Sequence, residues 1–385
     1  MPASEVEQIL AILRARFPWF SEVLAGIRPT ILYPAARMAR SGAAHLRSSG
    51  VRVIGFGDGN ASLWGSVVDG LPVWSPGEIA RDHGDAAVLV SSSIHDSAIC
   101  ETLDRQGCNW VIPMPVLNYL LPEYFPCREY TGALEAVISP ECRVRIEMAA
   151  EIFADDASRL VFLEKIRYLQ TLEKGRLDAI RCSQPIYFDP EVICLIPDEV
   201  FVDGGAFDGD TFSQFLHAGR GRFKTYYAFE PDPGNFARLQ QRTSEYRERV
   251  VVLPAGLADH TGHLTFECGA SYDSHMTTAS AQSPTATTVQ VHGLDDFFVN
   301  LAPPSFIKLD IEGAESQALN GAKRLITDQQ PILAISVYHN PCDLWELPLL
   351  IHELNPRYSL FLRHYTREID DTVCYAVPPG RQASS

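Results

Sequence analysis

The stretch Glu199–Thr211, EVFVDGGAFDGDT, decides the fold. It contains an apolar run, Val200–Val202, an acidic residue, Asp203, and three glycines, Gly204, Gly205 and Gly209. This order is typical of a buried parallel strand that enters a tight turn, with a helix beginning near Asp210 or Thr211. Glycines at such a turn let backbone N–H groups approach a ligand, and the following helix N-terminus adds partial positive charge. The stretch therefore predicts a ligand-binding turn in an α/β fold.

Acidic side chains surround this turn. Asp203, Asp208 and Asp210 belong to it, and no lysine follows its last glycine. A P-loop needs a Lys-Ser/Thr pair at that point, so the P-loop interpretation is excluded. Carboxylates repel a pyrophosphate but attract a ligand that carries an ammonium and a sulfonium. The turn therefore indicates S-adenosylmethionine, and a dinucleotide is the alternative.

Length and composition bound the class of protein. A chain of 385 residues exceeds a typical single core, so we expect two domains. A hydrophobic content of 46% with 21% charged residues describes an ordinary globular protein. The net charge of −16 argues against nonspecific binding to nucleic acids, which requires clustered Lys and Arg.

The sequence also carries expectations about compartment and thiols. We find neither a leader pattern nor an apolar run that could span a bilayer, and we expect a cytoplasmic protein. Its nine cysteines include no CxxC pair. We therefore expect free thiols, and neither a disulfide framework nor a metal site.

A second strand and glycine turn lies in the N-terminal half. Val51–Ile54 predicts a strand that ends on GFGDGN, residues Gly55–Asn60, which fits GxGxxG except at Asn60. No carboxylate about 20 residues further on is well placed to hold a ribose. Apolar runs at 87–91 and 110–112 predict further parallel strands. We favour a Rossmann-like domain over residues 1–133 without a nucleotide site, and an NAD site is the alternative.

The remaining chain predicts a linker and a second domain. Amphipathic periodicity over residues 134–182 indicates a helical linker, and residues 183–385 form the second domain. Four further strands are predicted there after the opening one: Thr225–Phe229, Val250–Leu253, Phe306–Asp310 and Ile332–Val337. Their alternation with helical segments predicts a doubly wound, mostly parallel sheet.

Residues at the ends of these strands are candidates for a ligand site. Glu230 follows the second strand, and its two carboxylate oxygens suit the two hydroxyls of a ribose. Pro231 stops that strand, and Asp232 or Pro233 begins the next helix. The small residues around Gly256 and Leu257 could admit an adenine, although a simple turn is equally consistent with them.

Two acids and a histidine follow the later strands. Asp310 ends its strand and Glu312 comes two residues later, so this pair needs a cation nearby. That cation could be the ammonium of the cofactor, a substrate amine, Lys308 or a divalent metal. His339 ends the next strand and is our candidate general base, because its pKa lies near neutrality. His275 and His364 are rivals for that role.

Four blocks of the sequence resemble a known family. They are DGGAFDGDT from Asp203, AFEPDPGNF from Ala228, LADHTG from Leu257 and FIKLDIEGAESQALNGA from Phe306. They are similar to the FkbM family of S-adenosylmethionine-dependent methyltransferases, and the similarity covers most of residues 186–378. The chain departs from the general methyltransferase motif at Phe207, where that motif has glycine and many family members have Asn.

The resemblance implies a class I methyltransferase fold and O-methylation of a hydroxyl on a sugar, glycan or secondary metabolite. It also implies that Glu230 holds the ribose and that Asp310 faces the methionine end. The predicted cofactor-binding residues are Asp203, Gly204, Gly205, Ala206, Gly209, Thr211, Glu230, Pro231, Asp232, Gly256, Leu257 and Asp310. The predicted catalytic residues are His339, Asp310 and Glu312. A metal-assisted reaction with Asp310 and Glu312 as ligands is the lesser alternative.

The acceptor is expected to be a small molecule or sugar, and a homo-oligomer is left open. Arg363–Tyr365, Asp343–Trp345, Ser271–Thr288 and Cys342–Leu350 are the segments expected to shape its pocket. Two other functions stay open. One is an NAD-linked oxidoreductase, and the other is a sugar-nucleotide-binding protein of polysaccharide biosynthesis with a non-catalytic methyltransferase-like domain.

Overall fold

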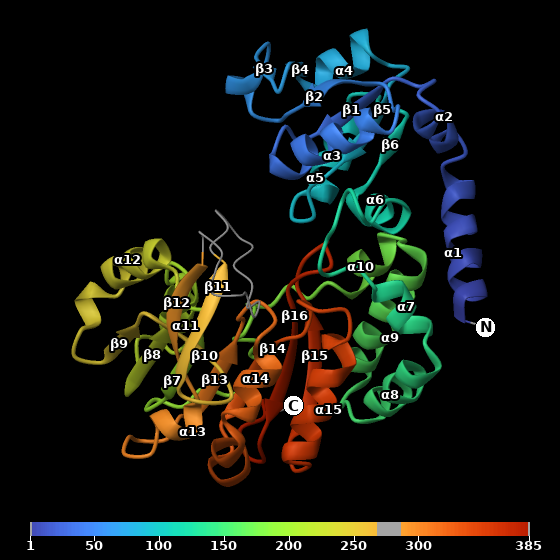
Figure 1. Ribbon diagram of the computed structural model, residues 1–385. Helices are drawn as coiled ribbons and strands as arrows, with labels where there is room; N and C mark the ends of the chain where they lie inside the picture. Colours follow the sequence, from blue (N-terminus) through green and yellow to red (C-terminus); the bar gives the residue numbers. More distant parts are fainter. Residues whose placement is uncertain (1, 268–285, 384–385) are drawn as a thin grey trace. The chain divides into compact units, whose positions relative to one another are not determined.

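The computed structural model describes residues 2–267 and 286–383, and the chain divides into two compact units (Figure 1). The first unit comprises Met1–Arg143, Glu164–Ala179 and Arg367–Asp370, and the second comprises Val144–Leu163, Ile180–Thr366 and Asp371–Ser385. The helical segment expected as a separate linker is thus divided between the units. In the described ranges, none of the helices has the length and apolar character needed to cross a bilayer.

The first unit is built on a six-stranded sheet. Its strands are β1 (Thr30–Tyr33), β2 (Val53–Gly57), β3 (Val67–Val68), β4 (Leu71–Trp74), β5 (Ala87–Val90) and β6 (Val111–Ile112). Their order is β3-β4-β2-β1-β5-β6, and only β3 runs antiparallel to its neighbour. The predicted strands of this half are found as β2, β5 and β6. The central strand, β1, was not predicted from the sequence.

Helices precede, connect and follow these strands. They are α1 (Pro2–Arg16), α2 (Phe20–Leu24), α3 (Arg37–Ser48), the turn η1 (Ala61–Leu63), α4 (Pro76–Asp82), α5 (Asp96–Arg105), α6 (Met114–Leu120) and α7 (Ala133–Ile138). The helical segment continues with α8 (Pro140–Glu151), α9 (Asp156–Thr171) and α10 (Gly175–Ile180). Ile31, Val88 and Leu103 lie in one buried cluster of this unit, which joins β1 to β5 and α5.

The second unit contains a seven-stranded sheet. Its strands are β7 (Val200–Gly204), β8 (Thr225–Phe229), β9 (Val250–Leu253), β13 (Phe306–Leu309), β14 (Ile332–Ser336), β15 (Ser359–His364) and β16 (Thr372–Val377). Their order is β15-β16-β14-β13-β7-β8-β9, and β16 runs antiparallel to both of its neighbours. The predicted strands Thr225–Phe229 and Val250–Leu253 coincide with β8 and β9. The predicted α/β fold with a doubly wound, mostly parallel sheet is confirmed.

Helices and a small sheet complete the second unit. The helices are α11 (Asp210–Ala218), α12 (Pro233–Arg242), α13 (Leu294–Phe297), α14 (Glu315–Asn320) and α15 (Asp343–Leu354), with the 3-10 helix η2 (Ser244–Tyr246) and the π-helix η3 (Leu325–Gln329). The small sheet consists of β10 (Ala255–Leu257), β11 (Gly262–Glu267) and β12 (Ala286–His292), in the order β10-β12-β11.

The position of β7 in the sheet indicates where the candidate site lies. β7 pairs with β8 on one side and with β13 on the other, and Gly204 faces Phe229 and Leu309 in these two ladders. The chain runs from β7 to β8 and β9, and later returns on the opposite side as β13 and β14. The strand order therefore reverses between β7 and β13. Open α/β sheets bind their ligands at such a reversal, at the carboxyl ends of the strands.

Buried aromatic rings hold β7 in place. Phe201 in β7 stacks within 4.7 Å of Phe215 in α11 and within 4.8 Å of Phe306 in β13, measured between ring centroids. All residues of β7, β13 and β14 are buried, as expected for parallel strands covered on both faces. The rigid sheet thus carries the loops that follow β7 and β13.

Candidate active site

The glycine turn after β7 lies directly against the loop after β13. Gly205 has a φ of +73°, and a Cβ added to it would come within 1.9 Å of the carbonyl oxygen of Asp310. Any side chain at this position would force the two loops apart. Gly209 has a φ of +90° and precedes α11 as its N-cap. The two glycines therefore permit a close loop contact and a left-handed turn, respectively.

The turn keeps its conformation although Phe207 stands where the general motif has glycine. Phe207 has a φ of +48°, in the left-handed region where a glycine would be unstrained. Its backbone N–H donates a hydrogen bond to Oε2 of Glu230, at 2.9 Å. The phenyl ring is 38% exposed, so the backbone keeps its conformation while the ring points away from the core. The substitution adds strain and preserves the turn.

Glu230 ends β8 beside this turn, as expected. Its Oε1 accepts a hydrogen bond from the N–H of Asp232, and its Oε2 accepts from the N–H of Phe207. Asp232 caps α12 by accepting from the N–H of Asn235, so the predicted helix start is confirmed. Burial raises the pKa of Glu230 to about 7, although the two backbone donors oppose the shift. Each carboxylate oxygen has a second lone pair that can accept a ligand hydroxyl.

Asp203 lies beneath the turn. Its carboxylate is completely buried, 3.0 Å from Nζ of Lys308, and it also accepts a hydrogen bond from the hydroxyl of Tyr226. Lys308 donates further hydrogen bonds to the carbonyl oxygens of Gly204 and Gly205. The ion pair thus supports the turn from below. Direct contact between Asp203 and a cofactor stays a prediction.

Asp310, Glu312, Glu315 and His339 form a compact cluster at the ends of β13 and β14, which we call the acid–histidine cluster. Nδ1 of His339 lies 2.9 Å from Oε1 of Glu315, so this ring nitrogen donates to the carboxylate. Nε2 of the same ring lies 3.3 Å from Oδ1 of Asp310 and 3.8 Å from Oε2 of Glu312. The structure therefore brings the three predicted catalytic residues together and adds Glu315, which the sequence analysis did not single out.

Exposure and charge differ within the cluster. The side chains of His339 and Glu315 are 2% and 1% exposed, whereas those of Asp310 and Glu312 are 25% and 48% exposed. Burial alone would lower the pKa of His339, but Glu315, Asp310 and Glu312 outweigh it and raise that pKa to about 9. Burial likewise opposes ionisation of Asp310, but Lys308 and His339 outweigh it and lower the pKa of this carboxyl.

Two tyrosines fix Asp310. The hydroxyl of Tyr187 donates to Oδ2 of Asp310 at 2.8 Å, and that of Tyr338 donates to Oδ1 at 3.1 Å. Tyr187 has a φ of +65°, an uncommon conformation for a residue with a side chain. Neither tyrosine was predicted as a site residue from the sequence. Tyr338 was visible only as a neighbour of His339, and nothing in the sequence marks Tyr187.

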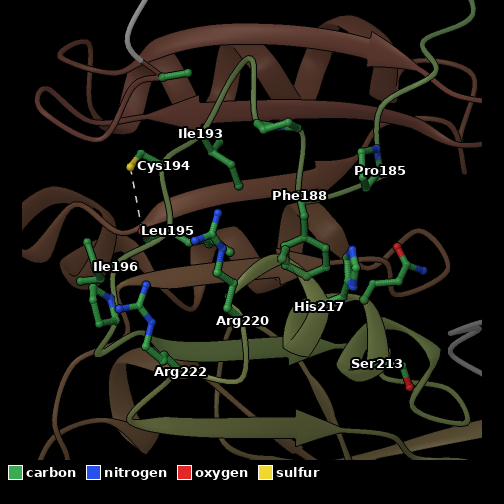
Figure 2. Close-up of a pocket in the computed structure, with 16 residues that line it drawn as sticks. Pro185, Phe188, Ile193, Cys194, Leu195, Ile196, Ser213, His217, Arg220 and Arg222 are labelled. Carbon is green, nitrogen blue, oxygen red and sulfur yellow. Dashed lines mark hydrogen bonds between the residues drawn. The ribbon is translucent and has the colours of Figure 1, made fainter.

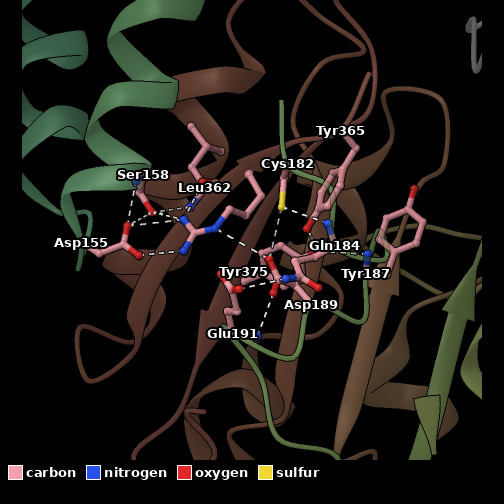
Figure 3. Close-up of polar contacts among 11 residues, drawn as sticks. Asp155, Ser158, Cys182, Gln184, Tyr187, Asp189, Glu191, Leu362, Tyr365 and Tyr375 are labelled. Atoms are coloured by element: carbon pink, nitrogen blue, oxygen red, sulfur yellow. Dashed lines mark hydrogen bonds and ion pairs between the residues drawn. The ribbon is translucent and has the colours of Figure 1, made fainter. Parts of the chain in front are cut away.

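A polar network holds the segment that carries Tyr187 (Figure 3). The N–H of Tyr187 donates to the hydroxyl of Tyr375, which is itself hydrogen-bonded to that of Tyr365. Arg363 binds Asp155 at 2.7 Å and lies 3.8 Å from Asp189. Arg363 and Tyr365, which we expected in the acceptor pocket, therefore take part in this network.

The other expected site residues have varied positions. Ala206, Thr211 and Leu257 are buried, and Leu257 packs over Gly204. Gly256 belongs to β10, and Pro231 lies between Glu230 and the cap of α12. Of the rival bases, His364 is completely buried and hydrogen-bonded to Thr372. His275 and most of the segment Ser271–Thr288 lie outside the described residues.

The residues around the turn fit the cofactor that the sequence predicts. Glu230 and Asp310 stand at the carboxyl ends of neighbouring strands in the reversal, where a ribose and an amino-acid end could bind. Lys308 is turned inward to Asp203, and Arg242 is paired with Asp208 at 3.0 Å. Carboxylates therefore dominate this edge, which favours a cationic ligand over a pyrophosphate.

Two cavities lie away from these residues. One of about 850 Å³ in the second unit is lined by Phe188, His217, Arg220 and Arg222, among others, and includes no member of the candidate site (Figure 2). Another of about 730 Å³ lies in the first unit, lined in part by Asp58 and the glycine turn that follows β2. Neither Lys nor Arg is found among the described residues that line this second cavity, and its one basic side chain there is that of His95.

Comparisons with known proteins agree with this geometry. Residues 203–371 match the family model described as the Methyltransferase FkbM domain. The chain is also similar to the crystal structure of a methyltransferase FkbM from Methylobacillus flagellatus KT. The two share 23% identity and a TM-score of 0.71, with 98% of this chain and 100% of that chain covered. This likeness shows a shared fold. None of the curated proteins compared with the chain matches it.

Other solved structures are similar only in part. An rRNA methylase from Streptococcus thermophilus has 16% identity and a TM-score of 0.31, and covers 49% of this chain and 90% of its own. Fibrillarin from Aeropyrum pernix, solved with S-adenosyl-L-methionine bound, has 9% identity and a TM-score of 0.30. It covers 48% of this chain and 69% of its own. These two likenesses are too weak to carry an argument about function.

Proposed function

We infer that this chain, whose residues 203–371 form a methyltransferase domain of the FkbM family, is an S-adenosylmethionine-dependent O-methyltransferase. One observation carries the proposal. The glycine turn, Glu230 and the acid–histidine cluster meet at the carboxyl ends of β7, β8, β13 and β14. A donor site and a proton-accepting site are thus adjacent at the reversal of one sheet.

The donor side uses the turn and Glu230. When bound, S-adenosylmethionine supplies an electrophilic methyl group. Glu230 accepts hydrogen bonds from the ribose hydroxyls, because backbone donors fix its two oxygens and a carboxylate oxygen can accept more than one hydrogen bond. Asp310 faces the amino-acid end, and its carboxylate is held ionised by Lys308 and His339. The N-terminal end of α11 closes the turn.

The acceptor side uses the acid–histidine cluster. Asp310 and Glu312 are its partly exposed members, so an acceptor hydroxyl reaches these carboxylates first. His339 lies behind them, and Glu315 fixes its ring with Nε2 directed at Asp310. In the simplest form of the reaction, the hydroxyl proton passes to this cluster. Because the pKa of His339 is raised to about 9, its ring acts as the nitrogen base only after it has released its own proton. Alignment of the hydroxyl with the methyl group contributes much of the acceleration.

The acceptor is proposed to be a hydroxyl of a sugar, glycan or secondary metabolite, as the family resemblance implies. The direct test incubates the full chain with S-adenosylmethionine and a panel of sugars and sugar nucleotides, and detects products heavier by one CH₂ by mass spectrometry. Calorimetric titration with S-adenosylmethionine measures donor binding separately. Binding without any methylated product would favour the non-catalytic alternative, and absence of binding would refute the proposal.

Variants test the residue roles. Glu230→Gln should weaken S-adenosylmethionine binding at least tenfold, whereas Glu248→Gln, an exposed glutamate of the same unit, should leave it unchanged. His339→Ala should lower turnover at saturating substrates by about 10²-fold, the lower end of the usual contribution of general acid–base catalysis. Unchanged turnover in His339→Ala would exclude this histidine from the proton-accepting group.

A further inference from the structure

We propose that the acid–histidine cluster binds a divalent cation, with Asp310, Glu312 and His339 as ligands and Glu315 as the carboxylate that orients His339. The chemical role of this cation rests on the proposed function, but the site itself is defined by coordination chemistry alone. One ligand atom each of Asp310, Glu315 and His339 lie within 4.8 Å of one another, and Oε2 of Glu312 lies 3.8 Å from Nε2 of His339. This side-chain cluster is compact enough for a single ion.

The first argument is the environment of Nε2 of His339. This atom is buried, and it makes no hydrogen bond with any described residue. It faces Oδ1 of Asp310 at 3.3 Å and Oε2 of Glu312 at 3.8 Å. Ligand atoms bonded to one small cation at about 2.1 Å are separated by roughly 3.0–3.4 Å. The first distance already has that value, and a small movement of the half-exposed Glu312 side chain would bring the second into the same range.

The second argument is the carboxylate on the other ring nitrogen. Glu315 accepts a hydrogen bond from Nδ1–H of His339, so a metal ion that displaces the second ring proton finds the lone pair of Nε2 directed at the cluster. Glu315 is itself anchored by the N–H of Ile311 at 2.8 Å. Metal-binding histidines commonly donate their second ring N–H to a carboxylate in this way, because the contact fixes the ring and increases its basicity. The ring is thus prepared to act as a ligand.

The third argument is charge. Three carboxylates of this cluster surround one imidazole, and the nearby Lys308 is already paired with Asp203. Even a protonated ring leaves the cluster negative, and Oε2 of Glu315 is buried without a hydrogen-bond partner among the described residues. Uncompensated buried charge is costly. A divalent cation would neutralise the excess.

The ligand types indicate which cations fit. A site of one imidazole and two carboxylates suits Mn²⁺, Fe²⁺ or Zn²⁺ better than Mg²⁺ or Ca²⁺, which prefer oxygen ligands alone. Three protein ligands leave positions open for oxygens of the acceptor. A coordinated hydroxyl becomes more acidic, so its proton can pass to solvent water. Its oxygen then bonds to the methyl carbon, and the carbon–sulfur bond breaks with its electron pair left on sulfur. In this metal-assisted form His339 is a ligand, whereas in the simplest form of the reaction it is the base.

The experiment titrates the full chain, stripped with EDTA, with Mn²⁺ in the absence of donor and acceptor. Calorimetry gives the affinity, and electron paramagnetic resonance counts the free Mn²⁺. We expect one Mn²⁺ per chain, with affinity reduced at least tenfold in Asp310→Asn and in Glu312→Gln. His260→Ala is the matched control, because His260 and Asp259 form an exposed histidine–carboxylate pair elsewhere in the same unit. It should bind Mn²⁺ like the wild type.

The outcomes separate this proposal from the proposed function. No binding by the stripped wild type, or equal affinity in Glu312→Gln, would overturn the metal site. Full methyl transfer in the presence of a strong chelator would overturn the catalytic role of the cation, and would leave the methyltransferase proposal intact. Glu312 is half-exposed, so Glu312→Gln should fold normally, and its thermal unfolding without metal verifies this.

Discussion

The buried pair of Asp203 and Lys308 predicts a large loss of stability in Lys308→Met. Both side chains are almost completely inaccessible, and Nζ lies 3.0 Å from the carboxylate. Methionine keeps most of the volume, so the loss comes mainly from leaving Asp203 buried without a counter-charge. Breaking a buried pair in this way costs about 3–5 kcal/mol. The variant also loses the two hydrogen bonds to the carbonyl oxygens of the glycine turn.

The assay is denaturant unfolding, with hydrogen exchange of β7 and β13 peptides to localise the change in the second unit. The deficit should shrink at low pH, because a protonated Asp203 needs no counter-charge. The double variant Asp203→Leu/Lys308→Met removes both charges and should recover most of the stability. A loss below about 0.5 kcal/mol in Lys308→Met, or a double variant as unstable as both single changes combined, would refute the reasoning.

The same double variant separates two roles of Asp203. If the carboxylate only supports the turn through Lys308, the double variant should bind S-adenosylmethionine with nearly wild-type affinity once it is folded. If the carboxylate contacts the cofactor, as the sequence analysis predicts, affinity should stay low although stability recovers. Calorimetric titration of the folded double variant decides between the two.

Three further changes give independent tests. Burial raises the pKa of Glu230 from 4.5 to about 7. The contribution of Glu230 to the free energy of unfolding is therefore present below pH 4.5 and is lost as the pH rises through 7. Glu230→Gln should flatten that part of a plot of Tm against pH. Tyr187→Phe removes a hydrogen bond to Asp310 worth about 1 kcal/mol, and steady-state kinetics should show kcat/KM about fivefold lower. Gly205→Ala should abolish donor binding in a calorimetric titration, because the added Cβ would overlap a backbone oxygen. The control is Gly221→Ala, at a φ of +71° and with no described atom within 4 Å of the added Cβ. It should lower the free energy of unfolding by only about 1–2 kcal/mol.

Local sequence was sufficient to predict several strands of the second unit. β8 and β9 were predicted to the residue because each is an apolar run that ends at a clear stop, such as Glu230-Pro231. β1 was missed because TILY stands among helical patterns. Its strand character comes from burial between β2 and β5, which is a tertiary property.

Some residues of the candidate site were likewise predictable from local sequence, and others were not. Glu230 and Asp310 were predicted because a residue at the carboxyl end of a parallel strand has a known place in the fold. The contact of Glu315 with His339 joins residues 24 positions apart, and that of Tyr187 with Asp310 joins residues 123 positions apart. Neither contact has a local signature, and the left-handed φ of Tyr187 cannot be read from its identity.

The two glycine turns of the chain show why the pattern alone does not identify a ligand site. In the first unit, a Cβ on Gly55 would lie within 2.2 Å of the Trp74 ring, and one on Gly57 within 2.4 Å of the Tyr33 ring. The missing side chains of those glycines make room for aromatic rings of the same unit. In addition, β2 lies one strand away from the reversal between β1 and β5. Gly205 instead admits the backbone after β13, at the reversal itself. The same small residue therefore serves packing in one unit and joins the two loops of the candidate site in the other. The position of the preceding strand in the sheet decides which of these two roles the glycine has.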